Sequence, residues 1–295
     1  MLIFGGSASE VLAIRVAREL GQDVSRLEVK KFPDGEKYIR VLDDVAGRDV
    51  LAIQSIYHKP DEYLLELLFL VNTLKDLEAR RVVAVVPYFA YARQDQRFNP
   101  GESVSFEIVT KLIEYAGIDE IYTIDTHLHR VPDISRMFKI PAHNLSATRL
   151  LAKYVKENFT LRNPLVIGPD EEAQQWASIA AKELNTDHDV LEKKRLGPER
   201  VEIKPKELNA RNRDIVVIDD IISTGGTIVE AIRGLQKEGA SNIVVACTHP
   251  VLAGNALTKI YQAGAHSIIG TDTIPSPIGY VSVSPLIAEI CWRQG

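Results

Sequence analysis

Short apolar runs alternate with amphipathic segments along the whole sequence, and this alternation leaves few folds open to the chain. Runs such as VVAVV at 82–86 are apolar on both faces, as strands buried in a parallel sheet are. The segments between the runs place apolar residues at helical spacing. Strands that alternate with helices in this way indicate α/β layers. We therefore expect an α/β protein with mainly parallel sheets flanked by helices.

Eight runs are predicted as strands: 1–4, 50–54, 82–87, 121–125, 165–168, 215–219, 243–247 and 267–270. Seven segments are predicted as helices: 9–20, 61–77, 105–115, 147–158, 172–184, 226–237 and 253–263.

The order of these elements repeats in the two halves of the chain. Residues 64–89 give helix, turn, strand and proline, and residues 228–250 give the same order. Chance similarity between two α/β units is the alternative explanation. We expect two similar domains in tandem, at residues 1–141 and 142–295, with the last helix packing on the first domain. No low-complexity linker separates them, which favours a tight contact and a ligand site at the interface.

Composition excludes several classes of protein. The net charge of −5 gives no basic field for nucleic acid, so no nucleic-acid partner is expected. No apolar run approaches the ~20 residues of a membrane helix, and the start of the chain does not resemble a signal peptide, so we expect a cytoplasmic protein without membrane contact. The two cysteines have no CxxC partner, so two reduced thiols are expected rather than zinc or redox chemistry.

The segment VVIDDIISTGGTIVEA at 216–231 ends a buried strand in two carboxylates. Gly225 and Gly226 permit a tight turn, whose amides would point with the next helix N-terminus at one spot suited to phosphate. No lysine follows the glycines, so a nucleotide P-loop is disfavoured. Asp219 and Asp220 would repel a phosphate placed directly beside them. They fit the site if the hydroxyls of a sugar, or a Mg²⁺ ion, lie between the carboxylates and the phosphate. A helix N-cap beside two solvated acids is the alternative. The segment predicts a cradle for a phosphorylated sugar.

This segment resembles the phosphoribosyl-diphosphate loop of the type I phosphoribosyltransferase fold. The resemblance implies that each half of the chain is a phosphoribosyltransferase-like domain. The loop alone does not separate transferases from the synthetase that makes the diphosphate. In the first half, QSIYHKPDE at 54–62 stands where the second half has the loop. It has no glycine, so we expect one ribose site in each chain.

Four other segments carry polar residues at turns or strand ends. KFPDGEKYIR at 31–40 contains a Pro-Asp-Gly turn, and the alternative is an ordinary hairpin. PYFAYARQDQRF at 87–98 combines aromatics with arginines that suit phosphates, and TIDTHLHR at 123–130 ends a strand in His127 and His129. HxH alone lacks a third zinc ligand. VIGPDEEA at 166–173 puts Asp170 at a further strand end.

With the loop, these motifs resemble the ribose-phosphate pyrophosphokinase family over nearly the full chain. KFPDGE, YARQDQR, DTHLH, GPD and DDIISTGGT stand in the family's order and spacing. RQDQRF and GPDEEA are most similar to its archaeal branch. Glu171 and Glu172 depart from many relatives, which have small residues after the GPD turn, and add negative charge beside the expected metal site.

The resemblance implies a nucleotide site that two subunits share. In the family, KFPDGE reaches the adenine site of a neighbouring subunit, which gives Phe32 a stacking role and Asp34 and Glu36 acceptor roles. The positions that match residues holding ATP are Arg93, Gln94 and Asp95. We therefore expect a homo-oligomer, a dimer or dimer-based.

The resemblance also implies the metal and sugar sites. His127 and Asp170 match Mg²⁺ ligands on the ATP side, and Asp219 and Asp220 match acids that serve the ribose hydroxyls and a second metal. Lys193 and Arg195 match a mobile basic loop that closes over the reacting phosphates. The residues that match the 5-phosphate cradle are Ser223, Thr224, Gly225, Gly226 and Thr227.

The implied reaction moves the β,γ-diphosphoryl group of ATP to the C1 hydroxyl of ribose 5-phosphate. A nucleobase phosphoribosyltransferase is one alternative, against which KFPDGE and RQDQR argue. A non-catalytic regulatory homologue is another, but the metal, basic and acidic residues are all present. A DNA repressor on this fold would need a helix-turn-helix segment, for which the N-terminus has no spare length.

Overall fold

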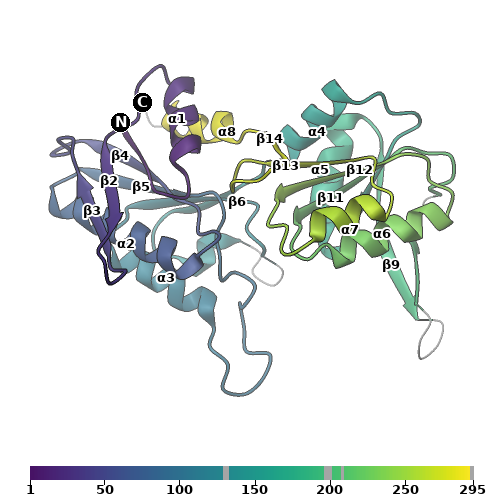
Figure 1. Ribbon diagram of the computed structural model, residues 1–295, viewed down its shortest axis with the longest axis horizontal. Coiled ribbons are helices and arrows are strands. Elements are labelled where there is room, and N and C mark those ends of the chain that lie inside the picture. Colours follow the sequence, from purple (N-terminus) through teal and green to yellow (C-terminus); the bar gives the residue numbers. More distant parts are fainter. Residues whose placement is uncertain (129–132, 196–200, 207–208, 293–295) are drawn as a thin grey trace. The chain divides into compact units, whose positions relative to one another are not determined.

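The computed structural model (Figure 1) describes residues 1–128, 133–195, 201–206 and 209–292, with 193–195, 201–205 and 292 described by backbone alone. The chain forms two compact units. Unit 1 is Met1–Leu145 with Thr273–Pro275 and the described residues from Ser282 onward. Unit 2 is Ser146–Asp272 with Ser276–Val281.

Unit 1 is built on a parallel sheet with the strand order β1-β4-β5-β6-β7. The strands of this unit are β1 (Leu2–Gly5), β2 (Leu27–Lys31), β3 (Lys37–Val41), β4 (Asp49–Ile53), β5 (Arg81–Val86), β6 (Glu120–Ile124) and β7 (Ala142–Leu145). The helices are α1 (Glu10–Glu19), α2 (Pro60–Asp76), α3 (Ser105–Tyr115), α8 (Ser284–Trp292) and the 3₁₀ helix η1 (Ile134–Met137).

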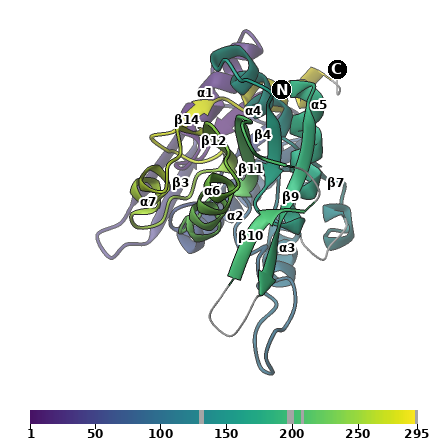
Figure 2. The ribbon, with the colours of Figure 1, turned by 90° about the vertical axis from the view of Figure 1, so that its right-hand side faces the viewer.

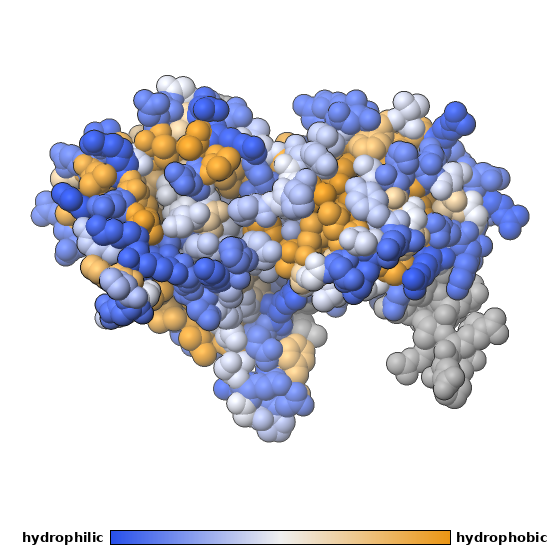
Figure 3. Space-filling view, in the orientation of Figure 1, coloured by the Kyte–Doolittle hydropathy of each residue, from blue (hydrophilic) through white to orange (hydrophobic). Residues whose placement is uncertain are grey.

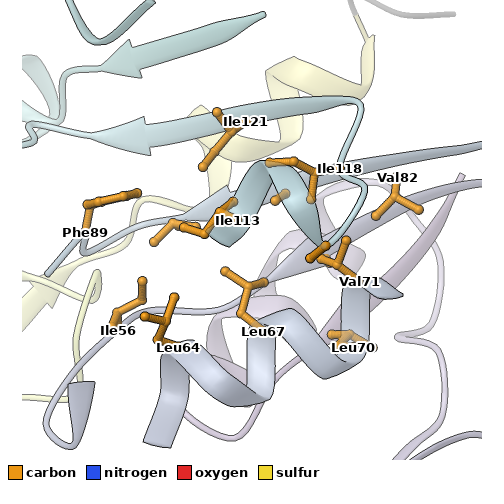
Figure 4. Packing of buried hydrophobic residues seen from close by; sticks show 14 of the residues in the cluster. Ile56, Leu64, Leu67, Leu70, Val71, Val82, Phe89, Ile113, Ile118 and Ile121 are labelled. Atoms are coloured by element: carbon orange, nitrogen blue, oxygen red, sulfur yellow. The ribbon is translucent and has the colours of Figure 1, made fainter. Parts of the chain in front are cut away.

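Helices cover both faces of the unit 1 sheet. Helices α2 and α3 lie on one side of it, and α1 and α8 lie together on the other (Figure 1). Figure 4 shows Leu64 and Leu67 of α2 and Ile113 of α3 pointing into one apolar cluster beneath the sheet. The last helix, α8, thus belongs to unit 1 and packs against α1.

Strands β2 and β3 form a separate antiparallel hairpin in unit 1. Their register pairs Leu27 with Val41 at the base and Lys31 with Lys37 next to the tip. Among the described residues, this two-stranded sheet pairs with no further strand. Isolated two-stranded hairpins are marginally stable, so contacts with the body of the unit must hold this one in place.

Unit 2 is built on a sheet with the strand order β10-β9-β8-β11-β12-β13-β14. Its strands are β8 (Leu165–Gly168), β9 (Asp187–Arg195), β10 (Val201–Pro205), β11 (Ile215–Ile221), β12 (Ile243–His249), β13 (Ser267–Thr271) and β14 (Gly279–Val281). Its helices are α4 (Thr148–Asn158), α5 (Gln174–Leu184), α6 (Gly226–Lys237), α7 (Ala256–Gln262) and the 3₁₀ helix η2 (Glu171–Ala173).

Side-chain alternation along β11 divides the core of unit 2 between two faces. Val216 and Ile218 pack with α4 and α5, whereas Ile215 and Val217 pack with α6 and α7. All pairs in this sheet are parallel except β9 with β10. Figure 2 shows these two strands as a ribbon that runs past the neighbouring strand ends.

The predicted fold class is confirmed, because both large sheets are mainly parallel and flanked by helices. Each predicted strand and helix has a counterpart, although the helix predicted from 172 begins as the 3₁₀ turn η2 and continues as α5. Strands β2, β3, β7, β9, β10 and β14 and helix α8 were not predicted from the sequence. Several of these strands carry many charged residues or lie at an edge, so they lack the apolar run on which the prediction relied. Among the described residues, no helix has the length and apolarity needed to span a membrane.

Candidate active site

The acidic pair lies near the carboxyl end of the central strand of unit 2. Asp219 is opposite Cys247 of β12, and Asp220 is only 2% exposed. One oxygen of Asp219 accepts a hydrogen bond from the Asp220 amide at 3.0 Å. Burial, with the charges of Asp220 and Asp170, raises the pKa of Asp219 well above its usual value. The strand end therefore favours a proton, a hydroxyl donor or a cation at Asp219.

The loop that follows the acids is fixed by backbone hydrogen bonds. The Ile222 amide donates to His249 O at 3.1 Å, and the amides of Leu252 and Ala253 donate to Ile222 O and Ser223 O at 2.9 and 3.0 Å. These bonds attach the loop to the residues that follow β12. A loop held in this way can present its donors without first becoming ordered.

Gly225 sets the conformation of this loop. Its φ of +76° lies in the left-handed region, and a Cβ there would stand 3.1 Å from Ile260 Cδ1. It is also the N-cap of α6, and no described side chain caps that N-terminus. Thr224, Gly226 and Thr227 are exposed around it. Uncapped first-turn amides with adjacent hydroxyls form an anion site.

Asp170 begins the turn after β8 and acts on the same strand-end region electrostatically. Its Oδ1 accepts from the amides of Glu172 and Ala173 at 3.1 and 3.3 Å, so the cap does not use Oδ2. The neighbouring Glu171 pairs with Lys206 at 3.1 Å. That pair offsets part of the extra negative charge in this turn.

Lys193 and Arg195 lie on strand β9, next to the undescribed segment 196–200. Their backbones pair with Ile203 and Val201 of β10. The sequence reading expected a loop here, and the structure instead extends the strand through Arg195.

In unit 1, Phe32, Asp34 and Glu36 form the tip of the β2–β3 hairpin. The Phe32 amide donates to Glu36 O at 2.9 Å, and Asp34 Oδ1 accepts from the Glu36 amide at 3.2 Å. The Phe32 ring is in edge contact with Tyr38, yet the residue remains 46% exposed. Its free surface can stack on a planar ligand.

The segment after β5 carries Arg93, Gln94 and Asp95, and Glu102 organises it. The two Glu102 oxygens accept from Asn99 Nδ2, the Phe98 and Asn99 amides and Gln94 Nε2, at 2.6 to 3.1 Å. These bonds, led by that from the Asn99 side chain, lower the pKa of Glu102 to about 2. The sequence reading missed Glu102, which lies outside the quoted motif. Arg93 is exposed and has no ion-pair partner among the described residues.

His127 is partly exposed just beyond β6 and follows the buried Asp125 and Thr126. The Thr126 amide donates to Asn144 Oδ1 at 3.0 Å, which holds this strand end against β7. His129 lies outside the described residues. Among the described side chains, no three acidic, His or Cys residues gather as a metal site.

The unit 1 counterpart of the acidic pair is filled by uncharged side chains. Gln54 lies four residues after Val50, which pairs with β1, just as Asp219 lies four after Ile215, which pairs with β8. Gln54 and Ser55 are completely buried. The Ser55 amide donates to Ser9 Oγ at 2.8 Å, so internal contacts occupy this strand end.

Comparison with known proteins identifies close relatives over the full length. Residues 1–117 match the N-terminal domain of ribose phosphate pyrophosphokinase, and residues 133–280 match a phosphoribosyl transferase domain. The ribose-phosphate pyrophosphokinase of Methanothermobacter thermautotrophicus is 46% identical over 98% of this chain and 99% of its own. That of Methanopyrus kandleri is 41% identical over 98% of each chain.

A crystal structure of phosphoribosylpyrophosphate synthetase from Mycobacterium smegmatis matches with a TM-score of 0.88 at 29% identity, and the match covers 100% of this chain and 99% of that one. These matches confirm two phosphoribosyltransferase-type domains. They also confirm the family resemblance and its archaeal character.

Proposed function

The chain belongs to the ribose-phosphate pyrophosphokinase family, and from that premise we propose that it transfers the diphosphoryl group of ATP to the C1 hydroxyl of ribose 5-phosphate. The products are 5-phosphoribosyl 1-diphosphate and AMP. The observation that carries the proposal is the acidic pair Asp219–Asp220 beside the uncapped N-terminus of α6. That arrangement suits a molecule with hydroxyls and a phosphate.

The sugar phosphate binds in unit 2. The amides of Gly226 and Thr227 and the hydroxyls of Ser223, Thr224 and Thr227 donate to the 5-phosphate. The ribose hydroxyls donate to Asp219 and Asp220, whose carboxylates are acceptors. The fixed loop supports this assignment because its donors are already oriented.

The transfer step is an in-line displacement at the β-phosphorus of ATP. The C1 oxygen of the sugar forms a bond to that phosphorus as the proton of its hydroxyl passes to solvent water. The bond from the β-phosphorus to the oxygen shared with the α-phosphorus breaks, and AMP leaves with that oxygen. Positive charge from Lys193 and Arg195 offsets the charge that develops on the leaving AMP.

Magnesium, when bound, neutralises phosphate charge and lowers the pKa of the attacking hydroxyl. The ligands we propose on the ATP side are His127 and Asp170, while Asp219 and Asp220 serve the ribose hydroxyls and a second metal ion. The raised pKa of Asp219 fits this role, because it reflects acidic groups that a cation would stabilise. Mg²⁺ usually takes only one or two carboxylates and completes its shell with phosphates and water.

The nucleotide is bound by residues of unit 1. Phe32 stacks on the adenine, and Asp34 and Glu36 accept hydrogen bonds from it. Arg93, with Gln94 and Asp95, binds the phosphates and ribose of ATP. The exposed Phe32 surface and the unpaired Arg93 side chain support these roles within the described part of the chain.

A homo-oligomer, in which a neighbouring subunit's hairpin completes the ATP site, is the proposed assembly. Helix α3 exposes Ile108, Leu112 and Tyr115, and apolar surface is visible along the region of this helix in Figure 3. Mixing Phe32→Ala with Lys193→Ala protein tests the shared site. We expect mixed oligomers to regain activity that both parents lack, because some sites then contain no mutated residue. Additive activity alone contradicts sharing.

The reaction itself is tested with ribose 5-phosphate, ATP and Mg²⁺, by resolving the nucleotide product. AMP that forms only in the presence of the sugar phosphate is the expected result. ADP indicates a simple kinase and refutes the nucleotide assignment. Binding of phosphoribosyl diphosphate without nucleotide turnover indicates a transferase or a regulator. In that case the sugar phosphate site is supported and the nucleotide assignments are refuted.

A further inference from the structure

A buried ion pair connects the hairpin of unit 1 with helix α2. Glu66 is 0% exposed, and its Oε2 accepts from Lys37 Nζ at 2.5 Å. The Lys37 side chain is itself only 5% exposed, at the start of β3. The other oxygen, Glu66 Oε1, accepts from the Ser7 amide at 2.6 Å. Glu66 therefore joins the hairpin to the loop after β1, at an end of the parallel sheet.

A second carboxylate, one helical turn earlier on α2, extends the connection. Glu62 accepts from Lys37 at 3.1 Å and from Lys31 at 2.8 Å. Lys31 and Lys37 are the cross-strand pair next to the hairpin tip. Hydrogen bonds, that from Lys31 first, lower the pKa of Glu62 to about 2. Helix α2 thus binds both strands beside the tip through hydrogen-bonded ion pairs.

This network lies at the end of the hairpin where apolar packing gives way to charged contacts. The base of the hairpin packs on the core through Leu27, Ile39 and Val41. The tip, from Phe32 to Glu36, is exposed. Apolar contacts tolerate small displacements, whereas buried charge pairs require defined donor and acceptor positions.

A contribution to stability alone does not explain a buried ion pair. Desolvation of two charges offsets most of their attraction, and an apolar pair of similar volume often gives equal or greater stability. The network does, however, restrict the direction of a hairpin that pairs with no other described strand. A restricted hairpin loses less entropy when its tip binds a ligand.

We propose that Glu66 and Lys37 are positioning residues for nucleotide binding, which fix the orientation of the tip that carries Phe32, Asp34 and Glu36. The inference rests on the proposed function. It assigns the network to ATP affinity, since neither residue is assigned a contact with the phosphates or the sugar. Without the network the tip opens more often and samples several directions, and the adenine selects only one of them.

The test compares Glu66→Gln and Lys37→Met with the control Lys59→Met in the full chain. Lys59 also pairs with Glu62, at 3.8 Å, but it is exposed and lies outside the hairpin. We expect about a tenfold higher KM for ATP in both network variants, of the order of one lost charge-assisted hydrogen bond. The kcat at saturating ATP and the KM for ribose 5-phosphate should stay within about twofold. The control should match the wild type.

Hydrogen exchange provides a readout that does not depend on activity. The Phe32 and Gly35 amides, bonded to Glu36 O and Phe32 O, should exchange faster in the network variants, while the amides of β4 and β5 should not. If Glu66→Gln fails to fold, the double variant Lys37→Met/Glu66→Gln removes both buried charges together. Unchanged KM for ATP in a folded variant overturns the proposal, as does an equal rise in the KM for ribose 5-phosphate. If the wild type makes no AMP, the proposed function fails even where the exchange result holds.

Discussion

Replacing Gly225 with alanine should destabilise unit 2 and weaken sugar phosphate binding together. The left-handed φ of +76° costs an alanine about 1–2 kcal/mol. The new Cβ would also stand 3.1 Å from Ile260 Cδ1, and relieving such an overpacked contact typically costs about 1 kcal/mol. We therefore expect about 2–3 kcal/mol of lost unfolding free energy. A displaced loop should also raise the KM for ribose 5-phosphate about tenfold.

Two other glycines of unit 2 separate these contributions. Gly254 has a φ of +63° and nothing within 4 Å of its Cβ position, so Gly254→Ala should show the backbone cost alone. At Gly226 no positive φ applies, and the nearest atom to a Cβ is Thr224 Oγ1 at 3.9 Å. Gly226→Ala should therefore be neutral or stabilise by about 0.5 kcal/mol. It serves only as a stability comparison, because Gly226 belongs to the proposed cradle.

Denaturant unfolding followed by tryptophan fluorescence measures the differences. Trp176 is buried in unit 2, so a Trp292→Phe background leaves a single reporter in that unit. If Gly225→Ala and Gly254→Ala lose the same free energy of unfolding, the contact between the new Cβ and Ile260 costs nothing. An unchanged KM for ribose 5-phosphate, in a variant destabilised as expected, would refute the role of this loop as the phosphate cradle.

Three further substitutions test the chemistry and the electrostatics. Asp219→Asn should lower kcat/KM at least about 100-fold. It should also raise the midpoint of thermal unfolding without ligand, because it removes the repulsion between Asp219 and the neighbouring carboxylates, and a lower midpoint contradicts this repulsion. Lys193→Ala should lower kcat by about 10²–10³ with little effect on the unfolding midpoint, and undiminished turnover removes β9 from the mechanism. Asp214→Asn should cost about 1–3 kcal/mol at pH 7, because hydrogen bonds from the Arg162 amide and from Asn242 outweigh burial and lower the pKa of this carboxyl. Because the pKa is lowered in the folded state, this stabilisation is present above the unfolded value of 3.8 and is lost as the pH falls below it. The difference in unfolding midpoint should therefore shrink as the pH is lowered below 3.8, and a difference that stays constant there contradicts the assignment.

The local sequence pattern predicted the parallel sheets of this protein, because a strand that is buried on both faces must be apolar along its whole length. The run VVAVV is typical of a strand between two layers of helices, and in the structure it forms β5. The charged strands carry no such pattern. Residues 187–195 read DHDVLEKKR, which contains no apolar run. They form a strand because their first half pairs with β8 and their second half pairs with β10.

The candidate site was predictable where chemistry and backbone conformation coincide in one segment. Asp219, Asp220 and Gly225 lie within seven residues, and the structure places them at one strand end and the following helix N-terminus. Groups that act through tertiary contacts could not be found in this way. Glu66 lies in the apolar run LLELLFL, and its partner Lys37 is 29 residues away. Glu102 resembles any exposed loop acid until Asn99 and Gln94 are seen to donate to it.

The matching strand ends of the two units differ in what surrounds them. In unit 2 the end of β11 presents Asp219, whose pKa is raised by burial and by the charges of Asp220 and Asp170, so we expect a ligand to determine which residue is accepted there. In unit 1 the end of β4 is closed by the buried side chains of Gln54 and Ser55, which contact only other residues of the chain. A Cβ at position 6 would clash with the Gln54 side chain, so the two positions constrain each other. We therefore expect a smaller residue at position 54 to be accepted together with a larger residue at position 6. If Asp219 binds the sugar phosphate as proposed, no change in its neighbours should restore the activity that its substitution removes. The same strand end of one fold thus serves internal packing in unit 1 and faces a proposed ligand in unit 2.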